Sequence, residues 1–148
     1  MKIISPVKLK NGILIDWKRK TLTDLVNEVR PQIKGKTLGG YSIGGAVALI
    51  LAQELNITKL VLYSPTPLFK ETLSTFSNNA LKVIGKKRLA DAKKYSIKKI
   101  ADNIKIPVKI YVGEKEKNIK LEQYLQKRLV NSSLTVKKGL THNNLLNT

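Results

Sequence analysis

The stretch between residues 36 and 64 constrains the fold of this chain more than any other part of its sequence. It reads KTLGGYSIGGAVALILAQELNITKLVLYS, and residues 44–55 at its centre are apolar nearly all round, which is typical of a buried helix. Residues 36–40 before it and 58–64 after it have the length and composition of strands. A strand, a helix and a second strand in this order indicate a βαβ unit in a parallel sheet.

Short apolar runs alternate with segments of helical period along the rest of the chain. The expected strands are residues 2–5, 12–17, 36–40, 58–64, 106–114 and 133–139, and the expected helices are 21–33, 44–55 and 119–130. Residues 66–105 contain helix-like pieces and no good strand, and they are too long for a bare connection. The sequence therefore predicts one α/β domain over residues 1–148. We expect three α/β/α layers around a mostly parallel sheet of about six strands, with a short helical cap at 66–105.

The composition is unusual in its charge. Lysine and arginine number 28 against 10 acidic residues, which gives a formal net charge of +18. Such a balance can attract nucleic acid, an anionic membrane or an anionic substrate. However, the lysines are spread along the whole chain, and arginine, which suits phosphate and base recognition better, is rare. We therefore favour a solvated lysine-rich surface over binding to nucleic acid or to an anionic membrane.

The counts of cysteine and histidine limit the kinds of site that the chain can build. The chain has no cysteine, which excludes disulfides and thiolate metal sites, and its single histidine is His142. We therefore expect neither a metal nor an organic cofactor. No apolar run is long enough to cross a bilayer, and the first residues lack the apolar core of a signal peptide. The expected location is the cytoplasm.

Ser42 lies in the motif G-x-S-x-G, which runs from Gly40 to Gly44. The motif follows an expected strand and precedes an expected helix, and in that context it forms a nucleophile elbow, a sharp turn that exposes the serine hydroxyl. The two glycines remove Cβ atoms that would collide with the neighbouring strand and helix. The start of the helix also supplies the backbone N–H of Ile43 where an oxyanion forms. The alternative interpretation is a plain glycine-rich turn.

A serine nucleophile needs a base that accepts its proton and an acid that orients the base. His142 follows the last expected strand, and Glu114 and Glu116 follow the strand before it. The order of serine, acid and histidine along the chain is that of the α/β hydrolases.

On these residues the chain resembles a small α/β hydrolase of the esterase, lipase and thioesterase superfamily. Residues 36–64 are similar to the strand, elbow, helix and strand of that superfamily. The segment IPVKIYVGEKE, residues 106–116, resembles its strand ending in G-x-x-D, and GLTHNN, residues 139–144, resembles its G-x-G-H loop. The resemblance covers most of the chain, and the elbow is its most specific part.

The resemblance implies that Ser42 is the nucleophile, Glu116 the acid and His142 the base. The sequence departs from the usual pattern in having glutamate rather than aspartate as the acid and Thr141 in place of the second glycine of the histidine loop. Glu114 is a second candidate for the acid, although it falls too early in the pattern.

The source of the second oxyanion donor leaves two alignments open. The family usually has His-Gly after the relevant strand, and this sequence has none. In the favoured alignment, residues 1–7 supply that strand and Val7 is the donor, because the proline before it has no N–H. In the other, residues 12–17 supply it and the donor is Trp17 or Lys18. Either alignment lacks the first two strands of the family, which implies a very reduced hydrolase.

By this resemblance the chain is a serine hydrolase that cleaves a carboxylic ester or thioester through an acyl-enzyme. Tyr41, beside the nucleophile, and Phe69, in the cap, are the expected substrate-binding residues. The other interpretation is a hydrolase-like protein without catalysis, whose basic surface binds an anionic partner. An open edge of the sheet can also pair with a second copy, so a homodimer is a further expectation.

Overall fold

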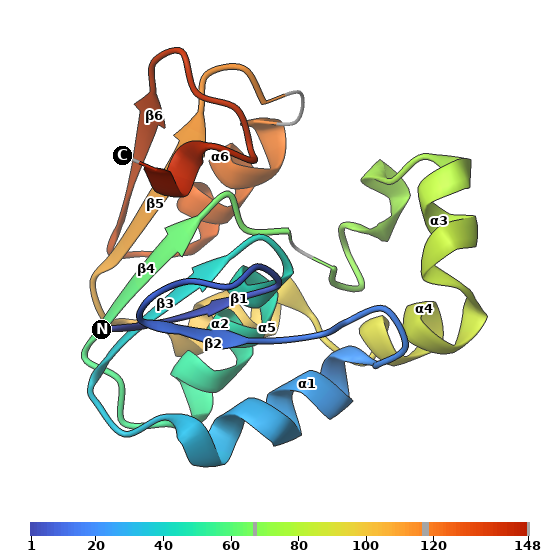
Figure 1. Ribbon diagram of the computed structural model, residues 1–148, viewed down its shortest axis with the longest axis horizontal. Helices are drawn as coiled ribbons and strands as arrows, with labels where there is room; N and C mark the ends of the chain where they lie inside the picture. Colours follow the sequence, from blue (N-terminus) through green and yellow to red (C-terminus); the bar gives the residue numbers. More distant parts are fainter. Residues whose placement is uncertain (67, 117–118, 148) are drawn as a thin grey trace.

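A parallel sheet lies at the centre of the computed structural model, which describes residues 1–66, 68–116 and 119–147. Its strand order is β2-β1-β3-β4-β5-β6, and every neighbouring pair is parallel (Figure 1). The strands are β1 (Lys2–Ser5), β2 (Gly12–Leu14), β3 (Thr37–Tyr41), β4 (Lys59–Tyr63), β5 (Val108–Gly113) and β6 (Ser132–Lys137). The α/β class and the parallel six-stranded sheet predicted from the sequence are confirmed.

The strand order decides which segment lies beside the turn at the end of β3. β1 pairs with β3, with Ile4 opposite Gly40, whereas β2 pairs with β1 at the edge of the sheet. The loop that follows β1 therefore lies next to the turn after β3, and the loop after β2 is one strand further away. Of the two alignments left open by the sequence, only the first agrees with this order.

Four helices form one layer on a single face of the sheet. They are α1 (Leu22–Val29), α2 (Ile43–Glu54), α5 (Ile97–Asn103) and α6 (Ile119–Arg128). The contacts between them run from α1 to α2, from α2 to α5 and from α5 to α6. α2 is central and is buried from its first residue to Ala52, as its apolar sequence predicts. No helix that the structure describes is both long and apolar enough to span a membrane.

The opposite face of the sheet is more exposed. Leu14 and Lys109 are exposed there, and the rings of Tyr63 and Tyr111 stack with centroids 5.4 Å apart. Among the described residues, the helices that pack on the sheet thus form one of the two helical layers of the expected three-layer arrangement. The physical reason is local: the connection from β1 to β2 is too short for a helix, and the described residues after β6 form only a 3-10 turn, η3 (Leu145–Asn147).

The segment predicted as a cap contains no strand among its described residues. It consists of η2 (Leu73–Thr75), α3 (Asn78–Ile84), α4 (Lys86–Ala92) and α5. α5 belongs to the helical layer, while η2, α3 and α4 project to one side of the sheet (Figure 1). We call residues 73–92, which contain η2, α3 and α4, the projecting segment.

The projecting segment is tied to the body through α4 and the start of α1. The carboxylate of Asp91 accepts hydrogen bonds from the Thr23 amide at 3.0 Å and from the Thr23 hydroxyl at 2.7 Å. The guanidinium of Arg88 donates to the Trp17 carbonyl at 2.7 Å and lies 4.7 Å from the centroid of the Trp17 ring. These bonds fix one end of the segment at a definite place beside the sheet.

Candidate active site

Ser42 forms the turn between β3 and α2 by itself. Its φ of 55° and ψ of −126° lie in a region that residues with a side chain seldom adopt. The Ser42 amide donates to the Tyr63 carbonyl at 3.1 Å, and the Ser42 carbonyl accepts from the amides of Gly45 and Thr66, both at 2.9 Å. Bonds from β4, from the loop after it and from α2 therefore hold a strained turn in place.

The glycines around Ser42 are required by close backbone contacts. A Cβ atom on Gly44 would lie 2.0 Å from the carbonyl oxygen of Ile4, and one on Gly40 would lie 2.5 Å from the carbonyl oxygen of Gly44. Both distances are far below van der Waals contact. Glycine at these two positions allows α2 to start directly against β1 and β3, which is the clearance that the sequence motif led us to expect.

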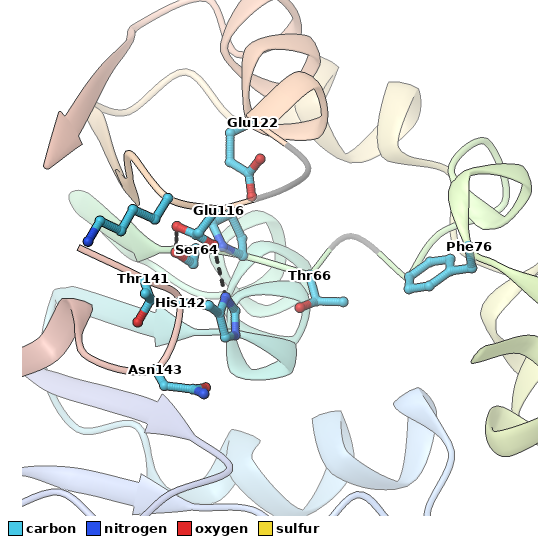
Figure 2. A pocket seen from close by; sticks show the side chains of 10 residues that line it. Ser64, Thr66, Phe76, Glu116, Glu122, Thr141, His142 and Asn143 are labelled. Atoms are coloured by element: carbon cyan, nitrogen blue, oxygen red, sulfur yellow. Dashed lines mark hydrogen bonds and ion pairs between the residues drawn. The ribbon is translucent and has the colours of Figure 1, made fainter. Parts of the chain in front are cut away.

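The side chains of Ser42, His142 and Glu116 are joined by hydrogen bonds. The Nε2 atom of His142 lies 3.0 Å from the Ser42 Oγ atom. The Nδ1 atom of the same ring lies 2.9 Å from Glu116 Oε1 (Figure 2). Ser42 follows β3, Glu116 follows β5 and His142 follows β6. The carboxyl ends of parallel strands meet at one edge of the sheet, and this edge brings together three residues that are far apart in the sequence.

The carboxylate of Glu116 is fixed by donors from two strands. The Ser64 hydroxyl donates to Glu116 Oε2 at 2.5 Å, and the Gly113 amide donates to the same oxygen. Burial works against ionisation of this group, but the hydrogen bonds with His142, Ser64 and Gly113 outweigh it, so the pKa of Glu116 lies below its ordinary value. Glu114 is exposed and accepts from the Gly139 amide at 3.1 Å, so it is Glu116 that contacts the histidine.

Tyr41 supports the histidine from behind. Its hydroxyl donates to the His142 carbonyl at 2.7 Å, and the two rings stack with centroids 5.3 Å apart. The Tyr41 side chain is buried, as is Phe69, which is 0% exposed in the hydrophobic core. The structure thus gives these two residues positions in the packing rather than the substrate-binding positions expected from the sequence.

The two candidate oxyanion donors differ in their surroundings. Ile43 is the first residue of α2, and the amides of the first turn of a helix have no acceptor within the helix. Val7, in the loop after β1, is half exposed, and its amide donates to the Ser5 Oγ atom at 3.0 Å. The Ile43 amide therefore has no acceptor within its own helix, whereas the Val7 amide has one in Ser5.

A cavity of about 380 Å³ opens beside His142, within the size range of small-molecule sites. Its lining includes Thr66, Glu116 and Glu122, and Phe76 of the projecting segment closes it from the far side (Figure 2). The Thr66 hydroxyl lies 3.3 Å from the Ser42 Oγ atom. Within the described parts of the chain, no group of three or more histidine or acidic side chains is placed to hold a metal ion.

Sequence reasoning missed Ser64 and Glu122. Ser64 is the residue directly after β4 and has a φ of 42°, and its only sequence signal is its place at the end of a buried strand before Pro65. Glu122 lies on the amphipathic segment expected as a helix, where a glutamate is unremarkable. Only the packing of that helix against the sheet shows that this glutamate faces inwards.

Comparison with known proteins rests on structure alone, because neither a family model nor a curated protein matches the sequence. Est1E from Butyrivibrio proteoclasticus superposes with a TM-score of 0.71 and 18% identity, over 83% of this chain and 63% of that one. MGS-MChE2, an α/β hydrolase enzyme from the metagenome of sediments of the Mar Chica lagoon, Morocco, gives 0.66 and 18%, over 87% and 64%. The esterase domain of a Rhodothermus marinus protein gives 0.62 and 15%, over 88% and 65%.

These likenesses establish the fold. The chain has the α/β-hydrolase fold, in agreement with the resemblance drawn from its motifs, and it spans about 63% of the length of Est1E.

Proposed function

We propose that this protein is a serine hydrolase that cleaves a carboxylic ester or thioester through an acyl-enzyme on Ser42. The observation that carries the proposal is the hydrogen-bonded series from Ser42 Oγ through His142 to Glu116, at a strained turn between a strand and a helix. The names of Est1E and of the Rhodothermus marinus esterase domain agree with this reaction class.

In the first half of the proposed reaction, Ser42 Oγ attacks the carbonyl carbon while His142 Nε2 takes the hydroxyl proton. The Ile43 amide donates to the negative oxygen of the tetrahedral intermediate, where a fixed donor stabilises the transition state more than the substrate. His142 then gives its proton to the leaving alcohol or thiol as the carbonyl re-forms. The acyl group is left on Ser42.

In the second half, water attacks the acyl-enzyme, His142 takes a proton from the water and returns it to Ser42, and the acid is released. Glu116 holds the imidazole with Nδ1 toward its carboxylate and stabilises the positive charge that the ring acquires in each half. The lowered pKa of Glu116 suits this role because the carboxylate stays ionised at neutral pH.

A fluorophosphonate probe tests the proposal directly. We expect the wild type to be labelled and to hydrolyse 4-nitrophenyl esters, and Ser42→Ala to do neither, because the probe bonds only to an activated serine oxygen. Ser133→Ala, which removes an exposed serine of β6, is the matched control and should be labelled like the wild type. A folded wild-type protein that neither reacts with the probe nor turns over esters would rule the proposal out.

A second candidate function is a binding protein of the same fold without catalysis. It is favoured by the Val7 amide, which donates to Ser5 and so leaves the elbow with a single donor. The net charge of +18 then suggests an anionic partner such as nucleic acid. Retention on immobilised DNA that falls steeply with salt, together with the absence of probe labelling, is the result that this function requires.

A further inference from the structure

Glu122 is a buried acid that the proposed reaction does not use. It comes from α6, lines the cavity beside His142 and is 6% exposed. Figure 2 shows its side chain descending from α6 toward the space between Glu116 and Thr66. Its Oε2 atom is buried and has no hydrogen-bond partner among the residues that the structure describes. The Nδ1 atom of His142 already bonds to Glu116, so a second acid is not needed for the triad.

A buried carboxyl with an unpartnered oxygen destabilises the folded protein. Burial raises the pKa of Glu122 to about 7, and the negative charge of Glu116 acts in the same direction, against a hydrogen bond from the amide of Glu122 itself and the charge of His142. Buried polar groups in folded proteins are nearly always paired, and each unpaired one calls for an explanation. An apolar side chain at this position would pack against the sheet without that penalty. The lone acid is explained if its partner arrives with a ligand, since it faces a cavity next to the candidate nucleophile.

The charged groups around Glu122 indicate which ligand group fits. Glu116 faces it from the loop after β5, and His142 faces it from the loop after β6. Lys115 lines the same cavity but is exposed and forms no ion pair with Glu122. The projecting segment contributes the uncharged ring of Phe76. Among the residues that the structure describes, the cavity therefore contains two carboxyl groups and no cation paired with the inner one.

We propose that Glu122 determines substrate specificity, and that its carboxylate binds a protonated amino group carried by the ester or thioester substrate. This inference rests on the proposed hydrolase function. An ammonium group has hydrogen-bond donors and no acceptor site. It can therefore donate to the Glu122 oxygen that has no partner. A hydrogen bond between two charged groups accounts for roughly 10-fold to 100-fold in affinity.

Two pairs of esters of equal shape test the inference. The first pair is 2-(dimethylamino)ethyl butyrate and 3-methylbutyl butyrate, which differ by a protonated nitrogen in the alcohol. The second is ethyl 4-(dimethylamino)butyrate and ethyl 5-methylhexanoate, which differ in the acyl chain. In at least one pair, we expect kcat/KM for the aminated ester to exceed that of its isostere by about 10-fold or more.

The pH dependence of this ratio separates Glu122 from the triad. His142 acts on both members of a pair, so its contribution to the rate cancels in the ratio. The carboxylate form of Glu122 predominates above its pKa of about 7, so the ratio should rise between about pH 5.5 and about pH 7.5, where the amine stays protonated.

Substitutions at two glutamates complete the test. Glu122→Gln should bring the ratio to about one at every pH, and Glu122→Asp, which keeps a carboxylate, should retain part of the preference. Glu114→Gln removes the same charge from the exposed loop after β5 and should leave the ratio as in the wild type. The inference is overturned if the wild type has no preference in either pair, or if Glu122→Gln keeps the preference.

Binding to Ser42→Ala, measured by titration calorimetry, distinguishes failure of this inference from failure of the hydrolase proposal. The variant should bind the aminated ester of the preferred pair more tightly than its isostere, and adding Glu122→Gln should remove the difference. If no ester is hydrolysed but this difference is found, the hydrolase proposal fails and the ammonium site stands. If esters are hydrolysed without any difference in binding or rate, the hydrolase stands and the ammonium site is wrong.

Discussion

The two sides of Ser42 are organised in different ways. Toward β4, β5 and β6 lies what we call the base flank, formed by Tyr41, Ser64, Glu116 and His142, where each member bonds to another that is distant in sequence. Toward β1 lies the β1 flank, Ser5 to Val7, where the candidate donor, the Val7 amide, bonds to the hydroxyl of Ser5, two residues before it.

This difference shows which groups of the site are positioned by contacts between strands and which by a local turn. On the base flank, residues that follow three neighbouring strands hold one another through several hydrogen bonds, so the geometry does not depend on one local turn. On the β1 flank, the direction of the Val7 amide depends on a local turn and on the hydroxyl of Ser5. In the proposed reaction, the base flank is already hydrogen-bonded before substrate binds, whereas the Val7 amide would have to leave Ser5 to serve as a donor. Substitutions on the two flanks should therefore differ in size.

His142→Ala should have the largest effect. The proposed reaction passes a proton through this ring in both halves, so we expect kcat for a 4-nitrophenyl ester to fall by roughly 10⁵-fold to 10⁶-fold. Circular dichroism and thermal unfolding check that the variant is folded. A residual rate above about one tenth of the wild type would break the comparison, because the base flank would then not be the centre of the chemistry.

Val7→Pro should have a smaller effect. Proline removes the backbone N–H and with it the candidate second donor, so we expect kcat to fall by about 10²-fold, at the low end for an oxyanion donor, because this amide must first leave Ser5. Val7→Ala keeps the amide and serves as the matched control, with kcat near that of the wild type. If Val7→Pro leaves kcat unchanged, the β1 flank supplies no donor and the elbow works with Ile43 alone.

Glu122→Gln should have the smallest effect of the three variants, and we expect it in the free energy of unfolding rather than in kcat. The pKa of Glu122 is raised from 4.5 to about 7 in the folded protein. Between these values the folded state holds a proton that the unfolded state has lost, so stability falls as pH rises from about 4.5 to about 7 and is level above that. The variant lacks this fall, so its free energy of unfolding relative to wild type should rise by roughly 2 kcal/mol between about pH 5 and about pH 8.

Urea unfolding at the two pH values measures this change, with Glu114→Gln as the control that loses the same charge at an exposed position. Equal pH dependence in wild type and Glu122→Gln would mean that the buried acid is compensated in the folded protein. The cavity beside the base flank would then lack the uncompensated carboxyl group that we assign to it.

The sequence predicted those parts of the site that depend on local order along the chain. The turn at Ser42 was recognisable because glycines at fixed spacing stand between a strand and a buried helix, and the close contacts of Gly40 and Gly44 explain that spacing. Glu116 and His142 were recognisable because they follow successive strands of a parallel sheet, whose ends share one edge. The sheet itself followed from the alternation of apolar runs.

The sequence could not predict what depends on packing between elements. Ser64 contacts Glu116 only through the pairing of β4 with β5, and Glu122 faces the cavity only because of how α6 is seated. Tyr41 and Phe69 were expected to bind substrate because apolar and aromatic residues near an elbow suit a pocket, yet both are buried. The sequence also did not predict that the described helices cover one face of the sheet. The apolar pattern of a buried strand is much the same whether helices cover one face of the sheet or both.

The long separation between contacting residues on the base flank has a kinetic consequence. The bond from Ser42 to His142 spans 100 residues, and that from Ser64 to Glu116 spans 52, because the projecting segment is inserted between β4 and β5. Contacts of such separation close large loops and form late in folding. We therefore expect a nascent or refolding chain to complete α2 and its neighbouring strands first, and to acquire its hydrogen-bonded serine, histidine and glutamate only in the final step.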